Sequence, residues 1–322
     1  MTTNPTVLVL LAAYNGEAFI GTQVASILHQ EAITVEVLIR LDPSTDDSQR
    51  VIDDLQRRSA NVHQLRSNAE QRPRGAAANF YKLIAEANVP ENVAYVALAD
   101  QDDFWYPNKL EGAVAKIEQH GVAAYSSDVD AWNEKSDSRV RIVKSQPQRR
   151  WDHLFSSAGP GCTYVLKRET FFALQKWIQS RFDEIQDIEY HDWLIYAWAR
   201  TNRYEWYIDS QSTLAYRQHA ANQLGANRGL AAAAKRLVSM RDGWYLQQAQ
   251  MIITVLRVNY GLPAHALANP SLVNRMRLAV HASQLRRSRK DQFGIALTSL
   301  ISPICSLTGA EAIETSMSEG PT

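Results

Sequence analysis

Cysteine is scarce in this sequence. Cys162 and Cys305 are the only two among 322 residues. They are too few and too isolated for a disulfide framework or a thiolate metal site. A reducing compartment is the simplest expectation, and we therefore expect a cytoplasmic protein.

Net charge and long apolar runs are lacking as well. The 34 Lys and Arg residues balance 34 Asp and Glu residues, which gives no global electrostatic case for binding nucleic acid. The apolar run Val7–Ala13 is far too short to span a bilayer, and no basic segment or cleavage site precedes it. We expect it to be a first strand. A hydrophobic content of 45% and a charged content of 21% are typical of a globular protein with one large α/β domain and an appendage, or with two small domains.

Strand and helix patterns alternate through the first 120 residues. Short apolar runs predict strands, and apolar residues at helical spacing predict the helices that follow them. The expected strands are Val7–Ala13, Val35–Leu41 and Tyr95–Ala99, and the expected helices are Glu17–Gln30, Gln49–Arg58, Ala76–Ala87 and Lys109–His120. This order is typical of an α/β protein with a mostly parallel sheet and right-handed crossovers.

Three carboxylates follow the strand Tyr95–Ala99, at Asp100, Asp102 and Asp103. Open α/β sheets bind ligands at this end of their strands. Carboxylates so close together repel one another unless a cation or hydrogen-bond donors neutralise them. A hard divalent metal that carries phosphate oxygens would do so. A solvated loop that leads into a helix, with Pro107 in its first turn, is the simpler alternative.

The run Asp-Gln-Asp-Asp-Phe-Trp-Tyr-Pro-Asn-Lys-Leu, residues 100–110, resembles the acidic motif of family 2 inverting glycosyltransferases, and most of all their bacterial rhamnosyltransferase-like branch. With three further matching stretches, the resemblance covers roughly residues 6–225. It implies the GT-A fold, with a mostly parallel central sheet, flanking helices and a C-terminal helical extension. The implied domains are a catalytic domain at 1–228, a helical extension at 229–308 and a disordered tail at 309–322. Within the catalytic domain, 1–110 would bind the nucleotide sugar and 111–228 the acceptor.

The resemblance also implies the donor-binding residues. Asp42 would accept a hydrogen bond from the imide N–H of uracil or thymine, which cytosine lacks. A plain turn with a helix cap would explain Asp42–Asp47 equally well. Pro43 departs from the family pattern, because it fixes φ and removes an N–H. The other residues implied at the nucleotide or its diphosphate are Ala12, Tyr14, Asn15, Arg72, Arg74 and Asn79, together with Asp100 and Asp102 near the ribose, the sugar or a metal-bound water.

A divalent metal, Mn²⁺ or Mg²⁺, is implied by the same resemblance. Asp103 would be its principal ligand, with Asp102 and His219 as further ligands. The run Tyr216–His219 matches a Tyr-Arg-Gln-His sequence of the family, and Arg217 would stabilise the charge of the leaving diphosphate. A lone histidine is as readily structural, so for His219 both interpretations stay open.

The stretch Ile188–Trp198 supplies a candidate catalytic base. Helical spacing puts Asp192 in a first turn, where an N-cap is the simpler interpretation. The resemblance of His191-Asp192-Trp193 implies instead that Asp192 deprotonates the acceptor hydroxyl. His191 is the rival base. Gly161 and Cys162, in a glycine-rich turn, would lie beneath the transferred sugar, and His191 and Trp193 would lie near the acceptor.

The remaining segments carry no catalytic motif. Residues 133–150 are polar, and we expect a mobile connection. A strand is expected within 204–215, and helices at 230–260 and 271–289. A basic set, consisting of Arg275, Arg277, Arg286, Arg287, Arg289 and Lys290, precedes the apolar run 293–307. The region 275–307 would either contact anionic lipid headgroups at the cytoplasmic face of the membrane or pack on the catalytic domain.

The implied reaction is inverting transfer of a sugar, with rhamnose favoured, from a nucleoside diphosphate. We expect dTDP-rhamnose, with a UDP-sugar as second choice, and a glycan or lipid-linked acceptor of O-antigen, lipopolysaccharide core or exopolysaccharide. A sugar-phosphate nucleotidyltransferase would need a glycine-rich basic loop after the first strand, and Ala12–Gly16 is not one. A non-catalytic, membrane-associated scaffold with this fold would bind nucleotide without turnover.

Overall fold

The structure is a computed structural model that describes residues 4–66, 75–218 and 243–301. The sequence predictions for Arg72, Arg74, His219 and the segment 302–322 lie outside these residues.

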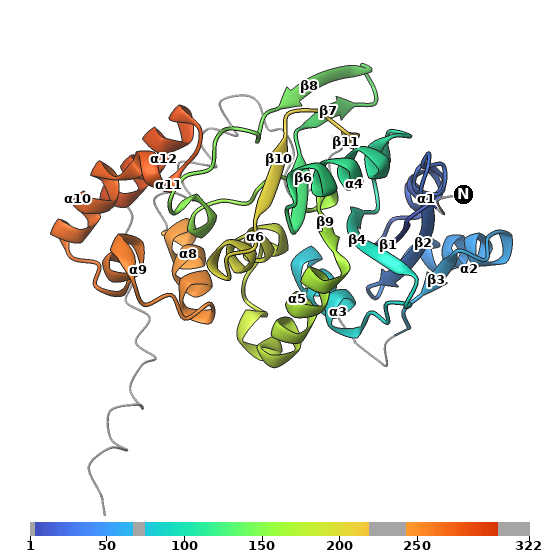
Figure 1. The fold of residues 1–322 in the computed structure, drawn as a ribbon, viewed down its shortest axis with the longest axis horizontal. Coiled ribbons are helices and arrows are strands. Elements are labelled where there is room, and N and C mark those ends of the chain that lie inside the picture. The colour runs from blue at the N-terminus through green and yellow to red at the C-terminus, as the bar shows by residue number, and fades with distance from the viewer. Residues whose placement is uncertain (1–3, 67–74, 219–242, 302–322) are drawn as a thin grey trace, which may run out of the picture.

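A seven-stranded sheet forms the centre of the molecule (Figure 1), in the order β10-β6-β9-β4-β1-β2-β3. All neighbouring strands are parallel except β9, which runs antiparallel between β4 and β6. The expected α/β class with a mostly parallel sheet is therefore confirmed. The strands are β1 (Thr6–Ala13), β2 (Thr34–Leu41), β3 (Val62–Gln64), β4 (Val93–Asp100), β6 (Ala124–Ser127), β9 (Val165–Lys167) and β10 (Trp206–Asp209).

Helices cover both faces of this sheet, and the alternation of side chains along β1 shows how. Val7, Val9 and Leu11 face one apolar core, while Leu8 and Leu10 face the other. Such alternation follows from the two-residue period of a strand. The first core is covered by α1 (Ile20–Leu28), α2 (Ser48–Arg58) and α4 (Lys109–His120), and the second by α3 (Ala76–Glu86), α5 (Arg168–Ser180) and α6 (His191–Thr201).

A second sheet lies beside the first, in the order β5-β11-β7-β8. Its strands are β5 (Phe104–Trp105), β7 (Val129–Asn133), β8 (Ser138–Ile142) and β11 (Leu214–Arg217). The expectation of a mobile connection throughout 133–150 is wrong, because β8 pairs with β7 over five residues. The single strand expected within 204–215 is instead β10 and the start of β11, in different sheets.

The described part of the chain ends in a helical extension, as expected. It consists of α8 (Trp244–Val255), α9 (Gly261–Ala268), α10 (Leu272–Val280), α11 (Ala282–Leu285) and α12 (Arg289–Ile301), which gather at the end of the molecule opposite α2 (Figure 1). The helix expected at 271–289 is wrong as one continuous element, because it is divided between α10 and α11. Among the described residues, no helix is both long enough and apolar enough to cross a membrane.

Candidate functional site

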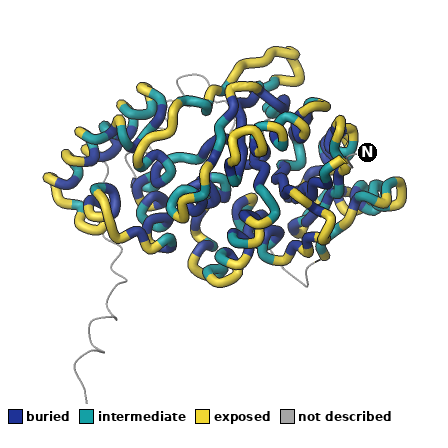
Figure 2. The backbone as a smooth tube through the Cα atoms, in the orientation of Figure 1, coloured by how far each residue is buried: buried dark blue, intermediate teal, exposed yellow. Residues whose placement is uncertain are grey.

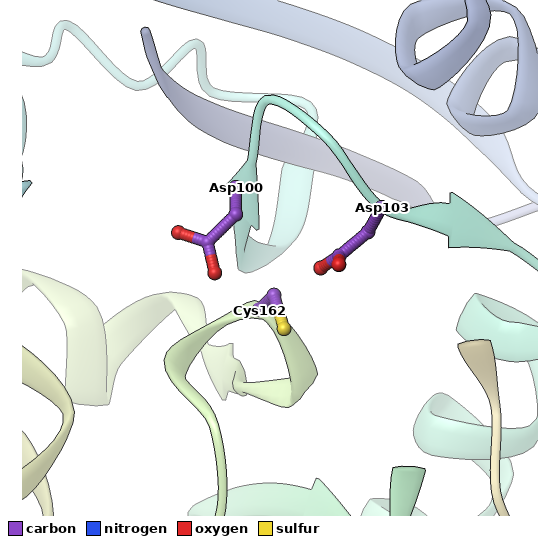
Figure 3. Close-up of side chains that lie close together, drawn as sticks. All are labelled: Asp100, Asp103 and Cys162. Carbon is purple, nitrogen blue, oxygen red and sulfur yellow. The ribbon is translucent and has the colours of Figure 1, made fainter. Parts of the chain in front are cut away.

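Three potential metal-ligating side chains converge at the carboxyl end of β4. Asp100 ends the strand, Asp103 precedes β5, and Cys162 comes from the short 3₁₀ helix η2 (Gly161–Thr163). Figure 3 shows the three side chains lying close together, and their ligand atoms lie within 4.8 Å of each other. Cys162 is about 60 positions from the two aspartates in the sequence, and it meets them here because β9, which follows η2, pairs with β4.

Asp103 is the least satisfied of these groups. Its side chain is only 1% exposed, and neither carboxylate oxygen has a hydrogen-bond partner among the described residues. Burial, together with the charges of Asp100 and Asp102, holds the pKa of Asp103 well above its usual range. Burial and the charges of Asp102 and Asp192 raise the pKa of Asp100 to about 7. An unpaired buried carboxylate is costly, so this cluster calls for a cation.

Lys109 supplies part of that positive charge from the first turn of α4. Its ammonium is buried, has no hydrogen-bond partner among the described residues, and lies 4.1 Å from the centre of the Trp105 ring. Burial lowers its pKa to about 8, and the neighbouring Cys162 and Asp103 oppose that shift. A single ammonium does not balance two or three carboxylates. Sequence reasoning missed this residue, although it lies within the acidic motif.

The donor set fits a divalent cation. Carboxylate oxygens are the ligands that Mg²⁺ and Mn²⁺ prefer, and the orphaned oxygens of Asp103 are available for that purpose. The thiol of Cys162 is a softer ligand and is expected to stay protonated, because burial and the two carboxylates raise its pKa. Asp100, rather than the predicted Asp102, joins Asp103 in this group.

Asp192 lies in the first turn of α6, as the sequence predicts. Its carboxylate accepts a hydrogen bond from the backbone N–H of Trp193 (2.8 Å), and the hydroxyl of Tyr164 donates to its carbonyl (3.0 Å). Burial raises the pKa of Asp192 to about 6, against the opposing effects of Trp193, Ser157 and Lys144. A carboxylate with this pKa is ionised at neutral pH and is a better proton acceptor than an ordinary aspartate.

Asp192 and the acidic cluster act on one another. The charge of Asp192 is close enough to raise the pKa of Asp100. Since Asp192 comes from α6 and Asp100 from the end of β4, the fold brings together the candidate base and the candidate metal ligands from stretches about 90 residues apart in the sequence.

His191 is poorly suited to act as the base. Its ring stacks on Phe80, with 3.9 Å between ring centres, and burial lowers its pKa to about 3. A Cβ at Gly161 would overlap its Nε2 atom. The glycine at position 161 is therefore needed so that η2 can approach the start of α6 closely.

The predicted nucleoside-binding turns are joined to one another. The backbone N–H of Asn15 donates to Ser44 (3.0 Å), and its side-chain oxygen accepts from the N–H of Thr45 (2.8 Å). Gln101 forms two hydrogen bonds to the backbone of Tyr14, at 2.8 and 2.9 Å. The loop after β1 is thus fixed both to the loop after β2 and to the acidic motif.

Asp42 is buried beside these turns, where Arg40 forms an ion pair with its carboxylate. The Arg40 guanidinium also donates to Asn79 (2.8 Å), which in turn donates to the carbonyl of Ala13 (3.0 Å). The neighbouring Ala12 pairs with Arg40 on β2 and with Asp100 on β4. Arg40 was not singled out in the sequence, and only its two-residue spacing from Asp42 along the strand points to it.

Arg217 joins the second sheet to the acidic motif. It donates from Nε to the carbonyl of Asp102 (2.9 Å) and pairs with Glu134 (2.5 Å). The side chain is buried, with the rings of Phe19 and Trp132 against its guanidinium. It fixes the position of the loop that carries Asp102.

Trp193, predicted to lie near the acceptor, is buried between α6 and the C-terminal extension. It is 4% exposed, stacks on Tyr245 of α8, and donates to the carbonyl of His153 (3.0 Å). The structure thus gives Trp193 a packing role between α6 and the extension.

Another buried aspartate, in a segment that packs against α6, was missed in the sequence. Asp152, in η1 (Asp152–Leu154), is fully buried. It accepts from Arg287 (2.8 Å), Tyr196 (3.1 Å) and Arg200 (3.4 Å). Arg287 also donates to the carbonyl of Ser157 (2.6 Å). This network connects the C-terminal extension to the loop beside Asp192.

The sequence matches known proteins over most of its length. Residues 8–173 match the family described as Glycosyl transferase family 2. The chain is 36% identical over 296 residues to the dTDP-rhamnosyl transferase RfbG of Shigella flexneri, covering 89% of this chain and 98% of that protein. It is 25% identical over 162 residues to a protein of Escherichia coli, covering 50% of this chain and 60% of that protein. That protein is the UDP-Glc:alpha-D-GlcNAc-diphosphoundecaprenol beta-1,3-glucosyltransferase WfaP.

Solved structures resemble the fold at low sequence identity. TarS 1-349 of S. aureus in complex with UDP is 14% identical, with a TM-score of 0.49, over 92% of this chain and 90% of that chain. The mannosyltransferase PcManGT of Pyrobaculum calidifontis, in complex with GDP-Man and Mn²⁺, is 16% identical, also with a TM-score of 0.49, over 92% and 85%.

Proposed function

The chain belongs to glycosyl transferase family 2, and we propose that it is an inverting rhamnosyltransferase that uses dTDP-rhamnose and a divalent cation. The donor assignment is supported by the 36% identical relative that is named a dTDP-rhamnosyl transferase. The observation that carries the reaction type is the buried carboxylate of Asp103, whose two oxygens have no hydrogen-bond partner among the described residues. The part-buried carboxylate of Asp192 lies near the same cluster, since its charge raises the pKa of Asp100.

The donor would bind along the loops after β1 and β2, with Ala12, Tyr14, Asn15 and Asp42 at the nucleoside. Asp42 is held by Arg40, which would present a charged carboxylate to the imide N–H of thymine. Asp100, Asp102, Arg74 and Arg217 complete the proposed donor site. Asp103 and Asp100 would hold the cation, with Asp102 and His219 as further candidates, and the cation would offset the charge of the departing diphosphate.

Asp192 would take the proton of the acceptor hydroxyl. Its pKa of about 6 leaves it ionised at pH 7, and the hydrogen bond from Trp193 fixes its orientation. The hydroxyl would then attack the anomeric carbon on the face opposite the diphosphate, which inverts the configuration. Gly161, Cys162 and His191 would form the floor beneath the transferred sugar.

The acceptor is proposed to be a lipid-linked glycan of a cell-surface polysaccharide. The partial relative WfaP supports this class, because its name specifies a diphosphoundecaprenol-linked sugar as acceptor.

Two isosteric variants test the mechanism. Asp192→Asn should lower transfer from dTDP-rhamnose by at least about 100-fold, because removing a general base costs about 10²–10⁴-fold. It should leave dTDP binding unchanged in a thermal-shift titration. Asp103→Asn should lose both transfer and the cation-dependent part of dTDP binding. Asp54→Asn, on the outer helix α2, is the matched control and should change neither quantity.

Three results would contradict the proposal. Full transfer activity in Asp192→Asn would remove the base. A product that retains the anomeric configuration, measured by NMR, would exclude inversion. Release of pyrophosphate from dTTP in place of sugar transfer would indicate a nucleotidyltransferase.

A further inference from the structure

Exposed apolar side chains are concentrated in the C-terminal extension. Eight of the 13 large hydrophobic side chains that are exposed in the described residues lie within 260–301. Isolated exposed apolar residues are ordinary, whereas a concentration of them marks a binding surface. The eight are Tyr260, Leu272, Val273, Met276, Val280, Phe293, Leu300 and Ile301.

Four of these residues form one face of α10. Leu272, Met276 and Val280 are four residues apart, and with Val273 they span about 100° of the helix circumference. All four are more than half exposed. On the opposite side of α10, Asn274 and Leu278 are buried and hold the helix against the rest of the protein. The exposed apolar face is therefore not needed to anchor the helix.

Helix α12 contributes further apolar side chains and packs against α10. The guanidinium of Arg275 donates to the carbonyl of Ser299 (2.8 Å) and also to that of Leu300. Phe293, on α12, is 74% exposed. Figure 2 shows exposed stretches along both helices at this end of the molecule. We call the exposed side chains of α10 and α12 the terminal surface.

The terminal surface lies in a strongly basic region. Residues 243–301 contain seven Lys and Arg residues and a single acidic residue, Asp291, in a chain whose net charge is zero. Arg286 and Arg287 are engaged with the catalytic domain, at Phe155 and Asp152. Arg277, Arg289 and Lys290 are exposed on α10 and α12.

We propose that the terminal surface binds an anionic phospholipid bilayer. The apolar side chains of α10 and α12 would enter the headgroup region, and the exposed basic side chains would contact lipid phosphates. A second copy of this chain is a poorer occupant, because two such surfaces would bring like charges together. The inference extends the proposed function, since a lipid-linked acceptor lies at a membrane. Bilayer binding, however, can be measured without sugar transfer.

Vesicle co-sedimentation of the full chain tests whether the apolar side chains of α10 and α12 contribute to bilayer binding. The unmodified protein should bind vesicles that contain phosphatidylglycerol and should bind phosphatidylcholine vesicles at least about tenfold more weakly. Phe293→Glu and Val280→Glu should each lower the partition coefficient by about tenfold or more, because each replaces an inserted apolar group with an anion. Phe172→Glu is the matched control. Phe172 is also an exposed phenylalanine, but it lies on α5, so this change should leave binding unaltered.

A separate double variant tests how much the basic side chains contribute to bilayer binding. Arg277→Gln combined with Lys290→Gln should weaken binding to the anionic vesicles by about 25-fold, which corresponds to about 1 kcal/mol for each basic residue near the surface. Raising the salt from about 0.1 M to about 1 M shortens the Debye length from about 10 Å to about 3 Å, and binding should fall in parallel. A dTDP thermal-shift titration should be unchanged in all variants, which separates this proposal from the donor assignment.

Three outcomes would overturn the proposal. The first is equal binding by Phe293→Glu and by the unmodified protein. The second is a dimer in solution that Phe293→Glu converts to monomer, which would make a second copy the occupant. The third is vesicle binding that appears only after residues 302–322 are removed, which would make that segment the occupant.

Discussion

Two buried aspartates illustrate opposite uses of charge within this fold. Asp152, in η1, accepts hydrogen bonds from two arginines and a tyrosine. Asp103, at the carboxyl end of β4, is equally buried, but neither of its oxygens has a partner among the described residues. The difference identifies the first as a structural connection and supports the proposal that the second is a ligand site. Burial alone would not distinguish them.

The largest expected effect is at Asp152. Asp152→Ala should lower the free energy of unfolding by about 3–5 kcal/mol, because Arg287 would keep a buried charge without its carboxylate. Chemical denaturation with a full baseline measures this loss. Asp54→Ala, which removes an exposed ion pair with Arg57, is the comparison and should cost less than about 1 kcal/mol. Equal losses in the two variants would show that the network does not connect the extension to the core.

A smaller effect that depends on the cation is expected at Asp103. Without divalent cation, Asp103→Asn should cost clearly less than Asp152→Ala, since no partner is stranded. At a cation concentration about 100-fold above Kd, the unmodified protein should gain about 2.7 kcal/mol. The variant should gain nothing. Denaturation in EDTA measures the loss of stability without cation, and denaturation in Mn²⁺ measures the gain of stability with it. An equal gain in the unmodified protein and in Asp103→Asn would disprove the ligand assignment.

The smallest expected effect is a pH dependence that comes from Asp192. Its carboxylate accepts a hydrogen bond from Trp193, so its surroundings are intermediate between those of Asp152 and Asp103. The pKa of Asp192 is raised from 3.8 to about 6, so kcat/KM should fall about tenfold per pH unit below pH 6. The contribution of Asp192 to stability changes with pH in the opposite direction to kcat/KM. The unfolded chain ionises this group more easily, so its contribution to stability decreases as the pH rises from about 4 to about 6.

Lys144 provides the check on that pH profile. Its charge lowers the pKa of Asp192, so Lys144→Met should shift the acidic limb of kcat/KM to higher pH. An unshifted limb in this variant would mean that the limb reports a different group.

Most of the secondary structure was predictable from local patterns. The bounds of α4 were predicted without error, and those of β1, β2, α2 and α3 to within one residue. The polar strand β8 was missed, because its side chains are mostly exposed and its sequence, Ser-Arg-Val-Arg-Ile, has no buried alternating face. Its stability comes from pairing with β7, which a local pattern does not reveal.

The candidate site was only partly predictable. The acidic loop and the helix start at Asp192 have local sequence signals, and the family resemblance connected them. The position of Cys162 against Asp103 depends on the pairing of β9 with β4. The Asp152–Arg287 contact joins residues 135 positions apart. The resemblance of His191-Asp192-Trp193 implied an acceptor role for Trp193, but it did not reveal that this side chain packs on Tyr245 of α8, because neighbouring residues on a helix point in different directions.

Strand β9 limits where the chain can be cut to make fragments or chimaeras. Its residues come from beyond position 160, yet Tyr95, Val96 and Ala97 of β4 pair with it. A fragment that ends at residue 110 would expose this edge of β4, with unpaired backbone groups along an apolar strand, and should aggregate through it. Chimaeras that exchange donor specificity between relatives will therefore need to transplant η2 and β9 together with the N-terminal segment.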